Sequence, residues 1–187
     1  MKITHKIIAI IFAVFLTGKV ISQTNGNYLS ETRLIIQSED KKGNPFVANT
    51  EYAYMILNLT NGDFTLNADL SNIKTGDLKL DSLIRIQGPQ PLVFKGNINE
   101  NLFLFNQQIN DEKDYNMQGQ LSVNALSTTC VAQFDPINFA EKSDSKNYRM
   151  DFKLVVDASK IAILGLENKI NKQLVFEVVD GKLNTQL

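Results

Sequence analysis

The feature that most constrains this chain is the recurrence of short segments in which apolar and polar residues alternate. In one of them, Met117, Leu121 and Val123 share a face with Gly119, while polar residues occupy the other face. A side-chain period of two is that of a β-strand with one buried face. Such segments, bounded by Asn, Gly, Asp or Pro, are predicted at residues 29–38, 53–60, 63–70, 92–99, 102–107, 115–124, 129–135, 148–157 and 173–179.

Helical spacing is confined to a small part of the chain. Residues 76–87 place Leu80, Leu83 and Ile84 on one side of a predicted helix. Residues 158–164 predict a further turn or two. This pattern indicates an antiparallel all-β domain with one or two short helices. Because no long helix covers the apolar strand faces, the strands must cover one another, either as a closed barrel or as a β-sandwich.

One hairpin can be registered from the sequence. The Asn61-Gly62 dipeptide is a strong signal for a two-residue turn. With that turn, Leu57 faces Leu66 and Met55 faces Ala68, so one face of the hairpin is wholly apolar. The other face is richer in polar residues. We therefore expect a sheet that is buried on one face and wetter on the other.

The N-terminus has the three-part layout of a secretory signal peptide. Lys2 and Lys6 precede ten unbroken apolar residues, and a polar stretch that reaches Ser22 follows. Ten residues of helix span roughly 15 Å, about half of the hydrocarbon core of a bilayer. We therefore predict a signal peptide over residues 1–22 that is cleaved near Ser22, and one soluble domain over residues 23–187 without a membrane span. The mature protein is expected to be periplasmic or secreted.

Charge and histidine content exclude several function classes. Of the 19 Lys and Arg residues, Lys2, Lys6 and Lys19 lie in the first 22 residues, which hold no acid, so their removal takes the net charge from −1 to −4. A nucleic-acid-binding protein normally has the opposite sign. The single histidine, His5, lies in the same segment. The processed chain therefore has no imidazole for a Ser-His-Asp site or a His-ligated metal.

Other chemical candidates are weak. Cys130 is the sole cysteine, and its neighbours predict a buried strand position without a base to activate the thiol. Asp81, Asp135 and Glu177 are candidate paired carboxylates, but nothing in the sequence brings two of them together. We expect no enzyme activity, no metal and no cofactor.

A family resemblance arises in the second half of the chain. Residues 117–127 contain a predicted strand with Gly119 that leads into a short turn and the next strand. Upstream, a short helical segment at residues 81–83 is followed by a Pro-x-x-Phe strand start at residues 91–94. This arrangement resembles the YceI-like family of polyisoprenoid-binding proteins over about residues 48–180.

The resemblance implies an extended eight-stranded antiparallel barrel, lipocalin-like in outline, whose interior holds a long isoprenoid or other lipid chain. An eight-stranded barrel can hold one slender ligand or be filled by its own side chains. The alternative function is therefore a structural or interaction domain with a packed core. If a chain is bound, the predicted lining residues are Met55, Leu57, Leu59, Phe64, Leu66, Phe94, Leu121, Phe152 and Phe176.

The predicted signal peptide has a direct test. We expect the exported protein to begin at or near Gln23, because cleavage follows the polar stretch after the apolar run. N-terminal sequencing of the exported protein measures this. A sequence that starts at Met1 would contradict a soluble exported carrier.

Overall fold

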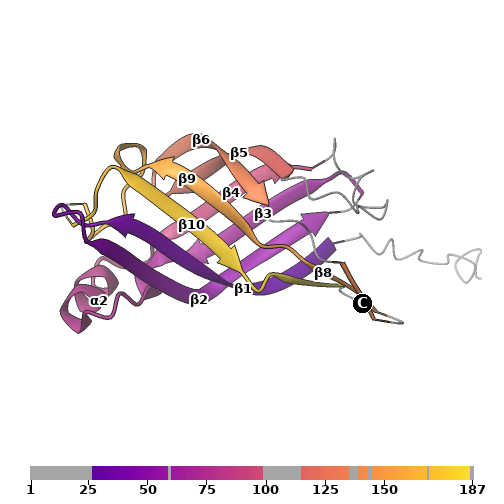
Figure 1. Ribbon diagram of the computed structural model, residues 1–187, viewed down its shortest axis with the longest axis horizontal. Helices are drawn as coiled ribbons and strands as arrows, with labels where there is room; N and C mark the ends of the chain where they lie inside the picture. The colour runs from indigo at the N-terminus through magenta and orange to yellow at the C-terminus, as the bar shows by residue number, and fades with distance from the viewer. Residues whose placement is uncertain are drawn as a thin grey trace, which may run out of the picture.

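The strands of this chain close into a barrel (Figure 1). The computed structural model describes residues 27–58, 60–98, 115–134, 139–142, 145–167 and 169–185. Eight antiparallel strands form the barrel. They are β1 (Asn27–Glu39), β2 (Pro45–Asn58), β3 (Asp63–Asp69), β4 (Pro91–Asn97), β5 (Tyr115–Val123), β6 (Leu126–Phe134), β9 (Phe152–Asp157) and β10 (Gln173–Val179).

The ring closes between the first and last barrel strands. The strands follow one another in the order β10-β9-β6-β5-β4-β3-β2-β1, and β1 also pairs with β10. At this closure Leu34 lies opposite Val178, and Ile36 lies opposite Phe176. The expected antiparallel barrel is confirmed. The β-sandwich alternative is wrong, because in a sandwich the sheet would end at β1 and β10 instead of joining them.

The period of two in the sequence corresponds to the inside and the outside of the barrel. In β3, Phe64, Leu66 and Ala68 are buried, while Thr65 and Asn67 are only partly buried. The same alternation runs along β4, β9 and β10. The inward residues of all eight strands form one buried apolar cluster. The barrel wall therefore encloses the hydrophobic core.

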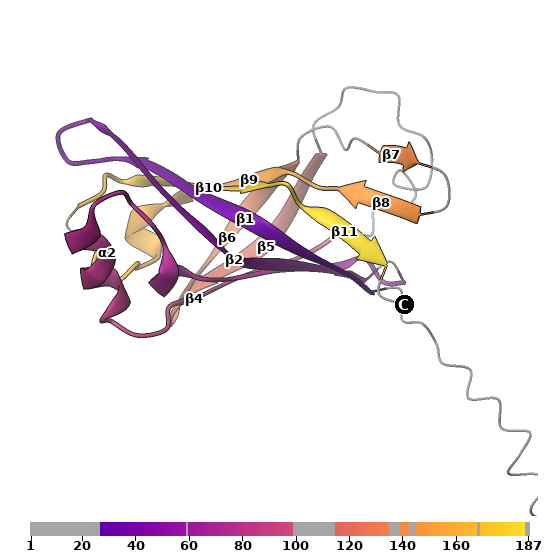
Figure 2. The same cartoon turned by 90° about the horizontal axis from the view of Figure 1, so that it is seen from below.

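Three further strands extend the barrel at one end, as Figure 2 shows: β7 (Phe139–Lys142), β8 (Ser145–Arg149) and β11 (Lys182–Thr185). β11 pairs with both β1 and β8, and β7 pairs with β8. Met150 and Asp151 separate β8 from β9, so the single strand predicted over residues 148–157 is interrupted. Asp180, with φ of 59°, and Gly181 separate β10 from β11 in the same way. The β8–β9 segment and the β10–β11 segment are thus both interrupted at the same end of the barrel.

The opposite end, called the helix end below, carries η1 (Leu70–Asn72), α2 (Leu78–Arg85), η2 (Ala158–Lys160) and the residues that follow η2 up to β10 (Figure 2). The two helical segments predicted from the sequence are confirmed as α2 and η2. Asp77 is the N-cap of α2, and its side chain accepts a hydrogen bond from the Lys79 N–H at 2.9 Å. No helix in the described ranges is long and apolar enough to cross a membrane.

The packed side of α2 is narrower than the sequence predicted. Ile84 is the one fully buried residue of this helix, and Leu80 is partly buried. Leu83, expected on the same side, is 41% exposed. The helix lies on the rim of the barrel and touches it along one stripe, so a residue one position around the helix already faces water.

The hairpin between β2 and β3 has the predicted faces but a different register. Leu57 lies opposite Phe64 and Met55 opposite Leu66, which is two residues from the predicted pairing. The predicted two-residue turn is wrong. The Gly62 N–H donates to the Asn58 carbonyl at 2.8 Å, so the turn that joins β2 to β3 is longer than two residues. A shift of two residues leaves every side chain on its original face, so the apolar face survives.

Other differences concern strand limits. β2 starts at Pro45 and β6 at Leu126, earlier than the predicted strands, and β7 and β11 were not predicted. The strand predicted at residues 102–107 lies outside the described residues. The signal peptide predicted at residues 1–22 also lies outside them.

Candidate functional site

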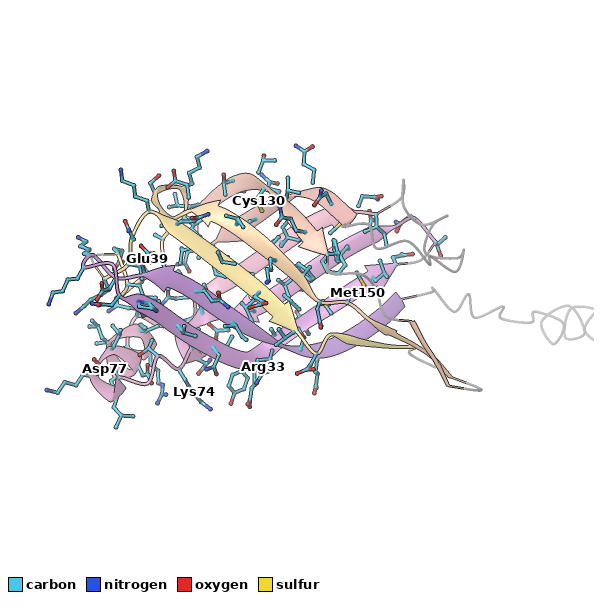
Figure 3. The ribbon with its side chains drawn as sticks, viewed as in Figure 1. Arg33, Glu39, Lys74, Asp77, Cys130 and Met150 are labelled. Atoms are coloured by element: carbon cyan, nitrogen blue, oxygen red, sulfur yellow. The ribbon has the colours of Figure 1, made fainter. Side chains whose placement is uncertain are left out.

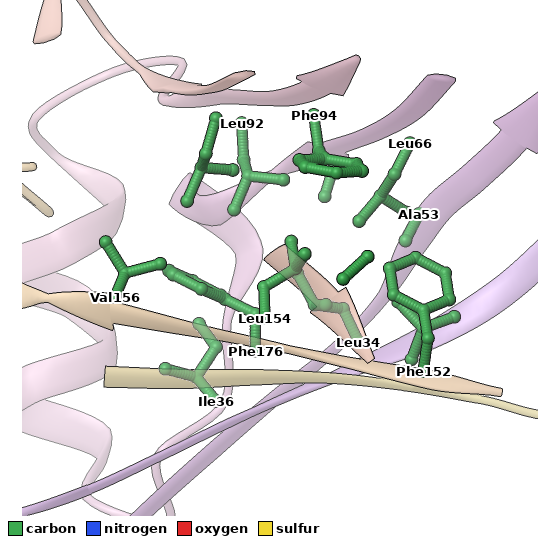
Figure 4. Packing of buried hydrophobic residues seen from close by; sticks show 14 of the residues in the cluster. Leu34, Ile36, Ala53, Leu66, Leu92, Phe94, Phe152, Leu154, Val156 and Phe176 are labelled. Carbon is green, nitrogen blue, oxygen red and sulfur yellow. The ribbon is translucent and has the colours of Figure 1, made fainter. Parts of the chain in front are cut away.

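The predicted lining residues lie inside the barrel. Met55, Leu57, Phe64, Leu66, Phe94, Leu121, Phe152 and Phe176 are all buried, each with an exposed fraction of at most 1%. They come from six strands: β2, β3, β4, β5, β9 and β10. Leu59 lies outside the described residues. Figure 4 shows Leu66, Phe94, Phe152 and Phe176 on facing walls of the interior. Whether a ligand touches these residues stays a prediction.

Aromatic rings occupy much of the interior. Phe64 lies edge-on to three other rings, with centroid distances of 6.3 Å to Phe94, 6.1 Å to Phe134 and 5.5 Å to Phe152. Phe134 and Phe152 are 4.9 Å apart. Phe134 was missed among the lining residues, although it follows the inward Ala132 by two positions in β6. The four rings form one cluster, called the phenylalanine cluster below.

A pair of glycines in the wall makes room for neighbouring side chains. Gly96 of β4 lies directly opposite Gly119 of β5. A Cβ on Gly119 would collide with the Phe94 ring and with the carbonyl oxygen of Lys95. A Cβ on Gly96 would lie 2.7 Å from the sulfur of Met117. The interior is therefore closely packed at this point, and side chains use the space that the glycines leave.

The interior offers little polar chemistry. No charged side chain is among the buried residues that the structure describes. The hydroxyl of Thr32 donates to the Val179 carbonyl at 2.8 Å, and that of Thr50 accepts from the Tyr52 N–H at 3.0 Å. Cys130 faces inward, and burial raises the pKa of its thiol to about 11. The prediction of a buried cysteine is confirmed, and its thiol stays protonated at neutral pH.

The helix end is closed by a few specific hydrogen bonds. Gln90 is fully buried, and its side chain donates to the Leu164 carbonyl at 3.1 Å and accepts from the Leu164 N–H at 2.7 Å. Its backbone N–H donates to Asp69 at 3.0 Å. Burial raises the pKa of Asp69, but hydrogen bonds from the Gln90 and Ser71 N–H groups outweigh it and lower this pKa overall. These bonds join the segment around α2 to the residues after η2.

Apolar residues fill the space beneath this closure. They come from η1, from α2 and from the segment after η2: Leu70, Ile73, Ile84, Ile161, Ile163 and Leu166. Gly165 permits the approach, since a Cβ there would lie 3.1 Å from Ile84. The helix end of the barrel is thus packed shut in this structure.

Two surface hollows lie outside the interior. One, of about 740 Å³, runs along the outer side of β2, β3 and β4 beside Tyr52, Tyr54 and Val93. The other, of about 350 Å³, lies at the helix end beside Ile161 and Lys172. Neither hollow is lined by the phenylalanine cluster, so neither is the predicted ligand site.

The two candidate carboxylates that the structure describes, Asp81 and Glu177, are engaged with different partners. Asp81 accepts hydrogen bonds from the Thr75 N–H at 2.8 Å and the Thr75 hydroxyl at 2.6 Å. Glu177, on β10, lies 3.1 Å from the Lys153 ammonium. Asp135 lies outside the described residues. Within the described ranges, no group of three His, Cys, Asp or Glu residues could hold a metal ion.

Comparison with known proteins identifies the fold. No family model matches the sequence, and no curated protein matches it. A polyisoprenoid-binding domain from Saccharophagus degradans, implicated in plant cell wall breakdown, superposes with a TM-score of 0.65. The match covers 86% of this chain and 99% of that domain at 13% identity. This chain has the fold of that polyisoprenoid-binding domain.

A second solved structure gives the same result. BcnA of Burkholderia cenocepacia superposes with a TM-score of 0.51 and 12% identity, over 81% of this chain and 94% of BcnA. The resemblance in the sequence is therefore confirmed at the level of the fold. The low identities leave the ligand to be argued from the interior itself.

The glycine pair predicts a difference between two matched variants. Gly119→Ala should cost about 3 kcal/mol, because its Cβ would collide with the carbonyl oxygen of Lys95, a backbone atom that the pairing of β4 with β5 holds in place. Gly96→Ala should stay within about 1 kcal/mol, because the Met117 thioether is flexible. Urea unfolding measures both free energies. Equal losses would show that the interior at Gly119 is loosely packed.

Proposed function

We propose that this protein binds a long apolar chain, a polyisoprenoid or a similar lipid, inside its barrel. The observation that carries the proposal is the interior itself. Strands close around a continuous apolar cluster, and the described buried residues include no charge. The fold shared with a polyisoprenoid-binding domain supports the same ligand class.

The chemistry of the interior favours an uncharged chain. Thr32 and Thr50, the polar residues of the barrel wall, already have hydrogen-bond partners, so they offer little to a polar ligand. An apolar chain gains about 0.8 kcal/mol for each CH₂ group that leaves water. A charged head group would lose its hydration without a partner inside. We therefore place the head group of any such lipid outside the barrel wall.

Binding requires interior side chains to move aside. Each aromatic contact in the phenylalanine cluster adds about 0.5–1.5 kcal/mol beyond the burial of its apolar surface, so an inserted chain has to keep that surface buried and supply contacts of its own. Met55 and Met117 lie in the same interior and have flexible, unbranched side chains. The methionine side chains are therefore the part of the lining that can rearrange at the lowest cost. We propose that a bound chain takes the place of rings and thioethers that pack on one another in this structure.

A second candidate function has an observation in its favour. The inward side chains of Leu34, Phe64, Leu66 and Phe94 are at most 1% exposed, so they already fill the interior. A barrel that is filled in this way needs no ligand for its stability. The alternative is a structural or interaction domain that binds nothing inside. A measurement of lipid binding, rather than of catalysis, distinguishes the lipid-binding barrel from the structural domain.

We further propose that the protein acts outside the cytoplasm, where it transports or stores its lipid in the cell envelope. The support is the N-terminal sequence, with its two lysines, ten apolar residues and Ser22.

The ligand prediction is tested on protein purified from its own host. Native mass spectrometry should find a mass excess of several hundred daltons, and organic extraction should release an isoprenoid or fatty chain. Leu66→Trp should reduce the amount bound, because a larger ring takes the volume of the chain. Thr65→Trp, on the outer side of the same strand, is the matched control and should retain the lipid.

The opposite outcome is equally clear. The packed-domain alternative holds if the protein carries no lipid, takes none up from a lipid mixture, and responds to Leu66→Trp only by losing stability.

A further inference from the structure

The solvent side of α2 carries large apolar side chains. Leu78 is 82% exposed, Ile86 is 75% exposed and Leu83 is 41% exposed. The first two are more exposed than any other large hydrophobic residue that the structure describes. This two-turn helix and the residue that follows it thus expose three large apolar side chains on the side opposite the buried Ile84. Packing against the barrel core does not explain why large apolar side chains face solvent here, and such exposed residues often mark an interaction surface.

Cations surround this apolar surface. Lys79 and Arg85 belong to α2 and Lys74 precedes it, and all three are exposed. In the described part of the chain none of the three forms an ion pair. Figure 3 shows Lys74 and Asp77 beside α2 at the helix end. The positive charge here is therefore available to an external anion.

The acids nearby are already engaged. Asp77 accepts from the Lys79 and Leu80 N–H groups at the start of α2, at 2.9 and 3.3 Å. Asp81 accepts from the backbone N–H and the hydroxyl of Thr75. Both carboxylates thus serve the local fold but keep their charge, so residues 74–85, with three cations and two acids, are net +1.

The helix end as a whole differs in charge from the rest of the chain. Its connections, residues 39–44, 69–90 and 157–172, hold eight Lys or Arg and seven Asp or Glu. The chain after residue 22 is net −4, so the remainder carries the negative charge. An anionic surface would meet less repulsion at the helix end than elsewhere.

We propose that the solvent side of α2 docks the barrel on an anionic lipid surface, with the helix end toward the bilayer. Apolar side chains flanked by Lys and Arg are the pattern of a helix that lies in a membrane interface. A protein partner fits less well, because a stable interface needs about 800 Å² from each side, which three side chains on a two-turn helix do not provide. A lipid surface accepts a small anchor and adds charge attraction.

The inference rests on the proposed function for its purpose, because a barrel that binds a lipid must meet a bilayer to exchange it. Docking and ligand binding are nevertheless measured separately. α2 also suits this place, since its one fully buried residue, Ile84, packs beside Gly165 at the helix end and leaves the opposite side of the helix to solvent.

The test uses the absence of tryptophan from the chain. In an Ile86→Trp variant of the whole mature protein, the new side chain is the sole tryptophan. Its emission should shift to the blue when vesicles of phosphatidylcholine mixed with an equal amount of phosphatidylglycerol are added. Vesicles of phosphatidylcholine alone should give a smaller shift. Val155→Trp, on the outer wall at β9, is the matched control and should not respond.

Co-sedimentation with the same vesicles separates the contribution of the apolar side chains to vesicle binding from that of the cations. Leu78→Gln combined with Ile86→Gln should weaken binding about tenfold. Val131→Gln combined with Val155→Gln, which removes two exposed apolar residues from β6 and β9, should leave it within about twofold. Lys79→Gln and Arg85→Gln should each weaken binding to the anionic vesicles about fivefold.

The docking proposal is overturned if the protein does not sediment with anionic vesicles, or if both double variants lose binding equally. A concentration-dependent dimer that the Leu78 and Ile86 variants abolish would instead assign the surface to a second copy of the chain. Protein that carries lipid but ignores vesicles refutes docking alone. Protein that binds vesicles but never holds a lipid refutes the proposed function alone.

Discussion

The pairing of β1 with β10 is the constraint on which the rest of the structure depends. It joins Leu34 to Val178, which are far apart in the chain, and so turns an open sheet into a ring. The Thr32 hydroxyl, which donates to the Val179 carbonyl, reinforces the junction. Once the ring is closed, every inward residue is removed from water by its neighbours, and the alternation of each strand becomes a division between core and surface.

The closed ring explains why the interior can serve either as a core or as a binding site. The phenylalanine cluster stabilises the barrel without a ligand, and under the proposed function a lipid chain replaces some of its edge-on contacts. The specific side-chain hydrogen bonds lie at the helix end instead, where those of Gln90 and Asp69 hold the segment around α2 in place. The proposed ligand affinity therefore depends on the apolar strands, whereas the closure of one end depends on a few hydrogen bonds.

The sequence predicts what depends on local pattern and fails where distant strands decide. The faces of the β2–β3 hairpin follow from alternation, but its register does not, because side chains such as Asn58 build a longer turn than Asn61-Gly62 alone implies. The lining residues follow from the same alternation, and Phe134 could have been added by it. Barrel closure between β1 and β10, and the exposure of Leu83 on a rim helix, depend on tertiary contacts that no local window contains.

The proposed apolar chain among the inward side chains is located most directly by the quenching of a single tryptophan. Phe176→Trp exchanges one aromatic ring for another, which adds less bulk than Leu66→Trp, and so places the reporter inside the barrel on β10 while leaving room for a chain. Val155→Trp places one on the outer wall of the neighbouring strand. A lipid with bromine atoms along its apolar chain quenches tryptophan on contact. If the chain lies inside the barrel, strong quenching is expected in Phe176→Trp and little in Val155→Trp. Equal quenching in both variants, or none in Phe176→Trp, would contradict this placement of the chain.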